Sequence, residues 1–410
     1  MAIFLGAKGG DIVATQSATH LLAAVREKLA AKMAYLLVGE DEALLCGLRD
    51  RIGAELDFEE ECSRLFRLQM EELSRLEFAD QLPDACSRFT ALARDHFNRR
   101  GSVIAFHGLY AAFLELLLRR ALALAEACTE TAPSEPNSCC LMATGDAGRG
   151  ESLPGTVSRY FLIYPDLKTE LAGCFEEMGY RLIALLESCG IFAMGHRFSD
   201  DSGLWQGSES QWRSWCSSRI QRGEKVGETL ALLGDLRGVA GDKTLMAGMK
   251  SVAAEALSQT QEKDIFAQAV RKLSSLPVAL GMFGTLKTLR SGEHRGRFKL
   301  HEAALHPLMI NVRILAVHHG LQETGTIGRI KGLVDGGHLA VDLADRLLRA
   351  YHLLAGCRIR HAIVMDDWAA QEFYLNPDEL GEEDAYQFKG ALEAVVNLQK
   401  LVYQLFSEQG

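Results

Sequence analysis

Residues 139–166, CCLMATGDAGRGESLPGTVSRYFLIYPD, constrain the fold more than any other stretch of this sequence. Two apolar runs, Cys139–Ala143 and Tyr160–Tyr164, flank a turn that contains three glycines. Short apolar runs bounded by turn residues are typical of buried strands. The segment ESLPGTVS after Gly150 contains a proline and a glycine, so no full crossover helix fits before the second run. We therefore predict two strands joined by a glycine-rich loop.

This loop does not fit the two commonest phosphate-binding turns. A dinucleotide-binding turn or a P-loop runs into a helix whose N-terminal amides hold the phosphates. The P-loop also needs a lysine, which is absent here. The glycines would equally fit a tight turn without a ligand, because glycine adopts left-handed backbone angles at no steric cost.

The rest of the chain is mainly helical in pattern. Apolar residues recur at three- and four-residue spacing through residues 17–127, and helical patterns resume from about residue 250. Residues 129–138 (TETAPSEPNS) form the clearest linker, because they combine two prolines with polar residues. A third strand-like run, Thr229–Leu233, follows the glycine-rich stretch.

These patterns predict a mostly helical α+β protein in three parts. A helical N-terminal region covers residues 1–130, a small α/β domain with a mixed sheet covers 136–245, and a helical bundle covers 250–410. The N-terminal helices could also mediate a homodimer.

Charge and composition exclude several classes of partner. The net charge of −10 argues against a nucleic-acid binder, because neutralising phosphates needs a basic surface. No apolar run reaches the roughly 18 to 20 residues that span a bilayer. The start, MAIFLGAKGGDIV, lacks the basic region and long apolar run of a signal peptide. The 10 cysteines form no C-x-x-C pair, which favours reduced thiols in a cytoplasmic protein over a zinc site or disulfide framework.

The glycine-rich stretch resembles the nucleotidyltransferases related to PII-uridylyltransferase, a family often fused to CBS and cyclic-nucleotide-binding domains. The family's loop reads approximately G-S-E-G-R-G-E, followed by a strand with a D-x-D pair. The matching positions are Gly145, Gly148, Arg149, Gly150, Glu151, Thr156, Ile163, Tyr164 and Asp166. Similar order continues in LLGDLRGVAGDKTL and in HPLMINVRILAVHHGLQETGTIGRI. The resemblance covers about residues 75–410 and implies a nucleotidyltransferase-fold domain followed by a helical substrate-binding bundle.

The resemblance also implies a site that this chain has altered. In the family, the D-x-D pair and a third acid hold two Mg²⁺ ions against the phosphates. Here the pair is replaced by Val157 and Arg159, the loop serine is Asp146, and only the third acid, Asp235, remains as a candidate catalytic residue. One carboxylate cannot assemble a two-metal site, because Mg²⁺ needs several hard oxygen ligands. We therefore expect metal-dependent transfer to be disabled.

Three alternatives would restore a ligand site. Asp146, Glu151 and Asp166 could rebuild a metal site with Asp235, and Mg²⁺ would then be needed. Arg159 could replace a metal by pairing directly with phosphate, because a guanidinium binds it bidentately. The motif could also be misaligned by a residue or two.

The resemblance implies two groups of binding residues. The nucleotide-binding group consists of Gly145, Asp146, Gly148, Arg149, Gly150, Glu151 and Arg159. The group that would bind an anion or a partner consists of Arg313, Arg329, Arg358 and His361. Surface ion pairs would explain Arg149 and Arg237 equally well, and solvated helix faces would explain the bundle arginines. Trp205, Trp212 and Trp215 fit packing better than base stacking.

The segment HEAALH resembles a zinc-protease motif, but its His301 and His306 are five residues apart. On an α-helix this spacing turns the second ring about 140° away from the first, so we expect no shared metal.

Taken together, these features predict a nucleotidyltransferase-like signalling or regulatory protein, a pseudoenzyme that binds a nucleoside triphosphate, a nucleotide-like ligand or a partner protein without turnover. One alternative is an active enzyme that uses Mg²⁺ to transfer a nucleoside monophosphate to a protein or small acceptor. The other is a helical interaction scaffold.

Overall fold

A computed structural model describes residues 42–127, 139–156, 158–166, 169–191, 205–222, 226–261, 264–281, 284–368 and 373–407. The predicted helix at the N-terminus, the linker 129–138 and the position of Val157 lie outside the described residues. Among the described helices, none is long and apolar enough to cross a membrane.

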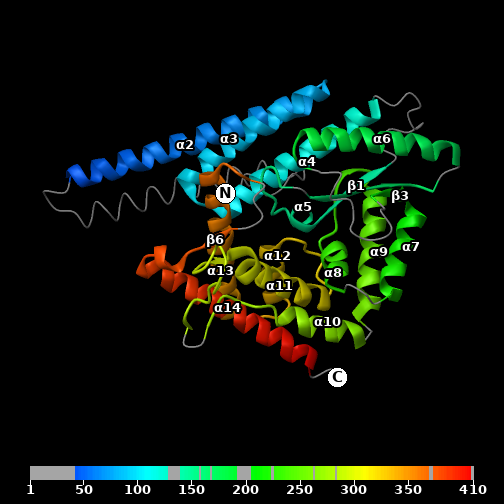
Figure 1. Ribbon diagram of the computed structural model, residues 1–410. Helices are drawn as coiled ribbons and strands as arrows, with labels where there is room; N and C mark the ends of the chain where they lie inside the picture. The colour runs from blue at the N-terminus through cyan, green and yellow to red at the C-terminus, as the bar shows by residue number, and fades with distance from the viewer. Residues whose placement is uncertain are drawn as a thin grey trace.

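Three helices form the N-terminal part of the structure and lie side by side (Figure 1). These helices are α2 (Glu42–Arg75), α3 (Leu82–Arg100) and α4 (Val103–Ala127), and a short 3₁₀ turn, Ala79–Gln81, precedes α3. Helix α3 begins with a proline in its first turn and ends at Gly101, whose φ of 61° is a left-handed cap. Helix α4 is buried around much of its circumference and also contacts the sheet and the C-terminal bundle.

A four-stranded mixed sheet has the order β3-β2-β1-β4. Strand β1 (Cys140–Thr144) pairs antiparallel with β2 (Arg159–Tyr164) and β4 (Arg237–Gly241), and β3 (Gln206–Ser208) pairs parallel with β2. Strand β1 is buried along its whole length, and β2 at every position but its first. The two strands predicted from the apolar runs are therefore confirmed.

The third predicted strand was wrong. Thr229–Leu233 lies inside helix α8 (Val226–Gly234), and the strand that completes the sheet, β4, follows it. The buried residues Val226, Leu230 and Leu233 recur at helical spacing. A five-residue apolar run is compatible with either element, so periodicity within the run alone does not distinguish them.

Helices α6 (Thr169–Ser188), α7 (Glu209–Arg222) and α9 (Lys243–Gln261) complete the α/β part (Figure 1). The three tryptophans pack inside it, as predicted. The Trp212 ring lies 4.4 Å from the ring of Phe161 and 5.0 Å from that of Trp215, both edge to face. All three tryptophans are buried, which leaves no face of them for a nucleotide base.

The remaining helices form a C-terminal bundle. Its members are α10 (Asp264–Ser274), α11 (His306–His318), α12 (Thr326–Asp335), α13 (Val341–Met365) and α14 (Glu382–Ser407). A two-stranded antiparallel sheet of β5 (Phe298–Lys299) and β6 (Tyr374–Leu375) lies beside it, and a 3₁₀ turn, Pro377–Glu379, follows β6. The predicted fold class, mostly helical α+β with a small mixed sheet, is confirmed.

The orientation predicted for HEAALH was wrong. Residues His301–Leu305 form one turn of π-helix that leads into α11, and the His306 amide donates to the His301 carbonyl. A π-turn brings residues five apart to the same side. The two imidazole rings consequently lie 5.8 Å apart.

Candidate functional site

The glycine-rich turn is a single helical turn, α5 (Gly145–Arg149), that directly follows β1. It enters through Gly145 (φ 63°) and ends at Gly150 (φ 70°), both in the left-handed region that favours glycine. Gly148 has a different role. A Cβ added there would lie 2.0 Å from the carbonyl oxygen of Asp235. The turn therefore packs directly on the backbone between α8 and β4.

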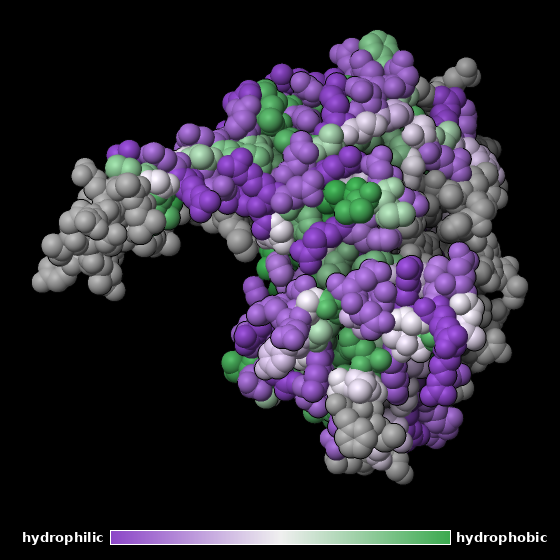
Figure 2. All heavy atoms as spheres, turned by 60° about the vertical axis from the view of Figure 1, so that its left-hand side comes forward, coloured by the Kyte–Doolittle hydropathy of each residue, from purple (hydrophilic) through white to green (hydrophobic). Residues whose placement is uncertain are grey.

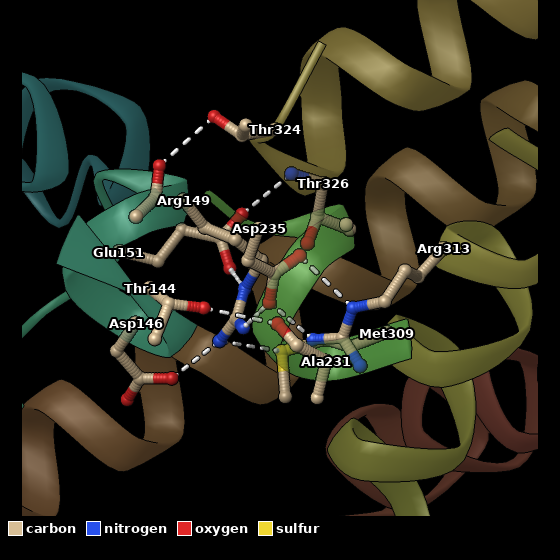
Figure 3. Close-up of polar contacts among 12 residues, drawn as sticks. Thr144, Asp146, Arg149, Glu151, Ala231, Asp235, Met309, Arg313, Thr324 and Thr326 are labelled. Atoms are coloured by element: carbon tan, nitrogen blue, oxygen red, sulfur yellow. Dashed lines mark hydrogen bonds and ion pairs between the residues drawn. The ribbon is translucent and has the colours of Figure 1, made fainter. Parts of the chain in front are cut away.

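Arg149, at the end of α5, lies among three carboxylates (Figure 3). Its Nε donates to Glu151 at 2.7 Å, its Nη1 donates to Asp235 at 2.6 Å, and its Nη2 donates to Asp146. The side chain of Arg149 is only 4% exposed, so Arg149 is not the surface ion-pair residue that was one of the two interpretations of the sequence. Burial disfavours its charge, but the three carboxylates outweigh this and raise the pKa of Arg149 well above its usual value.

Asp235, between α8 and β4, is bound by three arginines and is fully buried. Arg313 of α11 donates from Nε to Oδ1 at 2.9 Å and from Nη2 to Oδ2 at 2.5 Å. Arg329 of α12 donates from Nη1 to Oδ1 at 2.8 Å, and Arg149 supplies the fourth hydrogen bond. Burial opposes ionisation, but the charges of the three arginines outweigh it and hold the pKa of Asp235 below its usual value.

Thr326, the first residue of helix α12, and Thr324, just before the helix, contact the glycine turn (Figure 3). The Glu151 carboxylate accepts from the backbone amide of Thr326 at 2.6 Å, and the Thr324 hydroxyl donates to the Gly148 carbonyl at 2.9 Å. A carboxylate at the N-terminus of a helix is stabilised by the unpaired amides there. Sequence reasoning did not single out Thr324 and Thr326, although both belong to the segment HPLMINVRILAVHHGLQETGTIGRI that carries part of the resemblance.

The link between Asp146 and Arg358 of α13 is looser than the others. Asp146 Oδ2 lies 3.3 Å from both Nη1 and Nη2 of Arg358, and their side chains are 23% and 17% exposed. Burial opposes ionisation of Asp146, but Arg149 and Arg358 lower its pKa. Nearby, burial and the charge of Arg358 lower the pKa of His301 to about 4, so its ring is neutral at pH 7.

Two cavities adjoin Arg358. One is also lined by Glu151 and by His107 and Tyr351, two residues that sequence reasoning did not identify. The other is lined by His301, His361 and Phe373, with the His361 ring stacked 4.2 Å from Phe373. Of the four bundle residues singled out from the sequence, Arg313 and Arg329 therefore bind Asp235, whereas Arg358 and His361 line cavities.

The residues present do not fit a magnesium site. Both oxygens of Asp235 are occupied by guanidinium groups, and Asp146 is paired with two arginines. Asp166 lies apart from them, at the other end of β2, where it accepts from the amide and hydroxyl of Ser210 at 3.2 and 2.7 Å. In the described part of the chain, no group of three or more histidines, cysteines and acids is arranged to hold a metal ion.

Two further arginines flank the glycine turn. Arg159 begins β2 opposite Thr144, which places an exposed cation beside the start of α5. Arg237 of β4 donates to the carbonyls of Gly148 and Ala147 at 3.1 and 3.0 Å and to Glu115 at 3.2 Å. Arg237 therefore holds α5 to the sheet.

Comparison with protein-family models gives two matches. Residues 87–226 match the family described as "Putative nucleotidyltransferase DUF294", and residues 263–406 match the "Putative nucleotidyltransferase substrate binding domain". The two segments together make up more than half of the chain. A search of curated proteins gave no match. The two models match consecutive segments of the chain, and the chain belongs to the family described as "Putative nucleotidyltransferase DUF294".

Proposed function

We propose that this chain is a regulatory member of its family that binds the phosphate groups of a nucleotide without metal and does not transfer them. The observation that carries the proposal is the hydrogen bonding of the Asp235 carboxylate. This buried acid, the only one left of the three that the resemblance implies, accepts four hydrogen bonds from Arg149, Arg313 and Arg329. It therefore has no oxygen to offer a metal ion.

The charge of the site supports the same conclusion. The side chains that form the cluster are four arginines (Arg149, Arg313, Arg329, Arg358) and three acids (Asp146, Glu151, Asp235). Transfer in two-metal enzymes needs cations to neutralise the phosphates as charge develops. Fixed guanidinium groups can supply that positive charge for binding, but they cannot supply a metal's open coordination positions for the attacking group.

Arg358 is the best candidate for contacting a phosphate. Its ion pair with Asp146 is the longest in the cluster at 3.3 Å, and both side chains are partly exposed. It also lines both cavities. A phosphate could replace Asp146 as the partner of Arg358, because guanidinium pairs with phosphate bidentately.

Thermal unfolding of the full chain tests the proposal, with a panel of ribonucleotides in Mg²⁺, Mn²⁺ or EDTA. A ligand at about a hundred times its Kd stabilises the folded state by roughly 2.7 kcal/mol, which gives a readable rise in Tm. We expect a rise that survives EDTA and that is lost in Arg358→Gln. The matched control is Arg360→Gln, because Arg360 lies on the same helix but is exposed. A parallel assay with labelled nucleotide should give no transfer product.

Stabilisation that needs a divalent metal, together with transferred label, would show an active enzyme instead. A helical interaction scaffold is the second candidate function. It is favoured by the contact of α12 with the glycine turn, because Thr324 and Thr326 already donate hydrogen bonds to the Gly148 carbonyl and the Glu151 carboxylate. No change of Tm with any nucleotide would select the scaffold.

A further inference from the structure

Exposed cations gather in the loop that precedes β5, called here the basic loop (residues 287–297). Its four exposed cations are Lys287, Arg290, Arg295 and Arg297. Glu293 is the only acid in this loop, although the whole chain has a net charge of −10. Within the residues that the structure describes, none of the four cations forms an ion pair, whereas Lys299, just after them, pairs with Glu302. The basic loop therefore presents unneutralised positive charge to solvent.

The backbone of the basic loop is held in place. The Leu289 amide donates to the Arg297 carbonyl at 2.7 Å, and the Gly296 amide donates back to the Leu289 carbonyl at 3.0 Å. The His294 ring stacks on the ring of Tyr374 in β6, with their centroids 3.6 Å apart. The Leu289 side chain is itself 40% exposed among the cations. A loop that is already ordered loses little entropy when it binds a partner.

Exposed acids follow β6 in an acidic segment (residues 378–386). Its exposed acids are Asp378, Glu379, Glu382, Glu383 and Asp384. In the same described ranges these carboxylates form no ion pair. Glu379 accepts only from Nδ2 of Asn376, at 3.0 Å, and Glu383 from Nε2 of Gln387, at 3.2 Å. The N-terminus of α14 favours acids, but it leaves these carboxylates accessible. Tyr386, one turn further on, is 78% exposed.

The basic loop and the acidic segment leave the same end of the β5–β6 pair. The two strands are antiparallel, with Phe298 opposite Leu375 and Lys299 opposite Tyr374. The residues that precede β5 therefore adjoin the residues that follow β6. No ion pair joins the two groups within the described chain, although they are neighbours. This edge of the bundle consequently has a positive half and a negative half side by side.

We propose that a second copy of this chain docks on this edge, so that the basic loop of each copy lies against the acidic segment of the other. Adjacent patches of opposite charge are self-complementary under a twofold rotation whose axis passes between them. Leu289 and Tyr386 supply an exposed apolar side chain to each half, and aromatic side chains are favoured at the centres of interfaces.

Other anionic partners match this edge less well. A nucleic acid or a flat anionic membrane would be attracted by the basic loop but repelled by the five acids beside it. A second copy instead places each acid near a cation. None of the residues on this edge belongs to the arginine–carboxylate cluster, so the proposal does not depend on the proposed function. It also differs from the dimer through the N-terminal helices that the sequence suggested.

Sedimentation equilibrium of the full chain tests the proposal. We expect a dimer at about 0.1 M salt that dissociates at about 1 M, because the screening length falls from about 10 Å to about 3 Å. The double variant Arg290→Glu/Arg295→Glu should weaken dimerisation at least about tenfold, because attraction becomes repulsion. Glu382→Lys/Glu383→Lys should do the same. All four side chains are exposed, so circular dichroism should show an unchanged fold.

The matched control is Lys243→Glu/Lys331→Glu, which changes the net charge as much as the basic-loop variant does. Both of its lysines are exposed and lie on α9 and α12, so it should dimerise like the wild type.

Mixing the two interface variants gives the sharpest result. In the mixed pair each reversed patch meets an opposite charge, so a heterodimer should form from two chains that are each monomeric alone. A wild-type chain that stays monomeric at about 0.1 M salt over all protein concentrations would overturn the proposal. So would a dimer that neither reversal weakens, which would place the contact elsewhere, or a mixture that remains monomeric.

Discussion

Arg313 Nε lies 2.9 Å from Asp235 Oδ1, and Arg313 Nη2 lies 2.5 Å from Oδ2, so one arginine of the C-terminal bundle binds both oxygens of the acid that precedes β4. The pair joins the second of the two segments that match the family models to the residues between the segments. Arg329 and Arg149 add one hydrogen bond each to the same carboxylate. An acid that the resemblance assigns to catalysis is here the centre of a buried ion cluster.

Replacement of this acid should therefore destabilise the fold. In Asp235→Asn the three buried arginines lose their shared negative charge, and breaking a buried ion pair typically costs about 3–5 kcal/mol. Urea unfolding followed by circular dichroism measures the change in free energy. Asp335→Asn, at an exposed acid, is the control and should have no measurable effect. A variant as stable as the wild type would mean that Asp235 is not held by these arginines in solution.

Gly148 should not tolerate a side chain. In Gly148→Ala the added methyl would lie 2.0 Å from the Asp235 carbonyl oxygen, which is backbone and cannot swing away. We expect a loss of at least about 1–3 kcal/mol in the free energy of unfolding, the usual range for overpacking. The matched control is Gly108→Ala in α4, where no atom lies within 4 Å of the added Cβ. Equal stability of the two variants would contradict the close contact of α5 with Asp235.

Glu151 should hold the first turn of α12. In Glu151→Gln the amide nitrogen would oppose Arg149, and the charge that favours the helix N-terminus would be lost. An unsatisfied buried group costs about 1–3 kcal/mol. Hydrogen exchange should become faster at the amide of Thr326 and its neighbours. Glu302→Gln, at an exposed ion pair, is the control and should leave exchange in α12 unchanged. If Glu151→Gln also left this exchange unchanged, the contact between Glu151 and the first turn of α12 would be absent in solution.

Stability should fall as the pH drops from 6.5 towards 4. Burial lowers the pKa of both His107 and His301 to about 4. Between these pH values the unfolded chain binds a proton at each histidine and the folded chain does not, so the free energy of unfolding decreases. Each of these two pKa shifts corresponds to a loss on the order of 3 kcal/mol in the free energy of unfolding by the time the pH reaches 4.

Urea unfolding at several pH values measures this slope. His107→Gln should flatten it, whereas His352→Gln, at an exposed position, should not. A wild-type stability that stays constant from pH 6.5 to 4.5 would show that both rings ionise normally. Below pH 4 a further loss is expected as Asp235 and Asp146, whose pKa values are lowered, take up protons.

The sequence predicted the fold class and two of the strands because these depend on local patterns. Strand β4 was missed because its residues, Arg237–Gly241, include two glycines and carry no apolar alternation. The apolar run within helix α8 is short, and such a run predicts a strand as readily as a helix. The π-turn at His301–Leu305 has no sequence signal that distinguishes it from the α-helix that it precedes.

The site was predicted as a set of residues but not as a set of contacts. Asp146, Arg149, Glu151 and Asp235 were all identified from the glycine motif and its later partner segment. Asp235 pairs with Arg313 and Arg329, which lie 78 and 94 residues further along the chain, a separation that no spacing rule bridges. His107 and Tyr351 have no local motif, so their place beside Arg358 comes only from the packing of α4 against α13.

The position of Asp235 has a consequence for how members of this family can be recombined. It lies outside both matched segments, while Arg149 comes from the first of them and Arg313 and Arg329 come from the second. A chimera that takes either segment from a relative with a different arrangement of charges would leave buried arginines or a buried acid without counterions. We therefore expect the two segments to be exchangeable only together, unless a change of charge in one is matched by a change in the other.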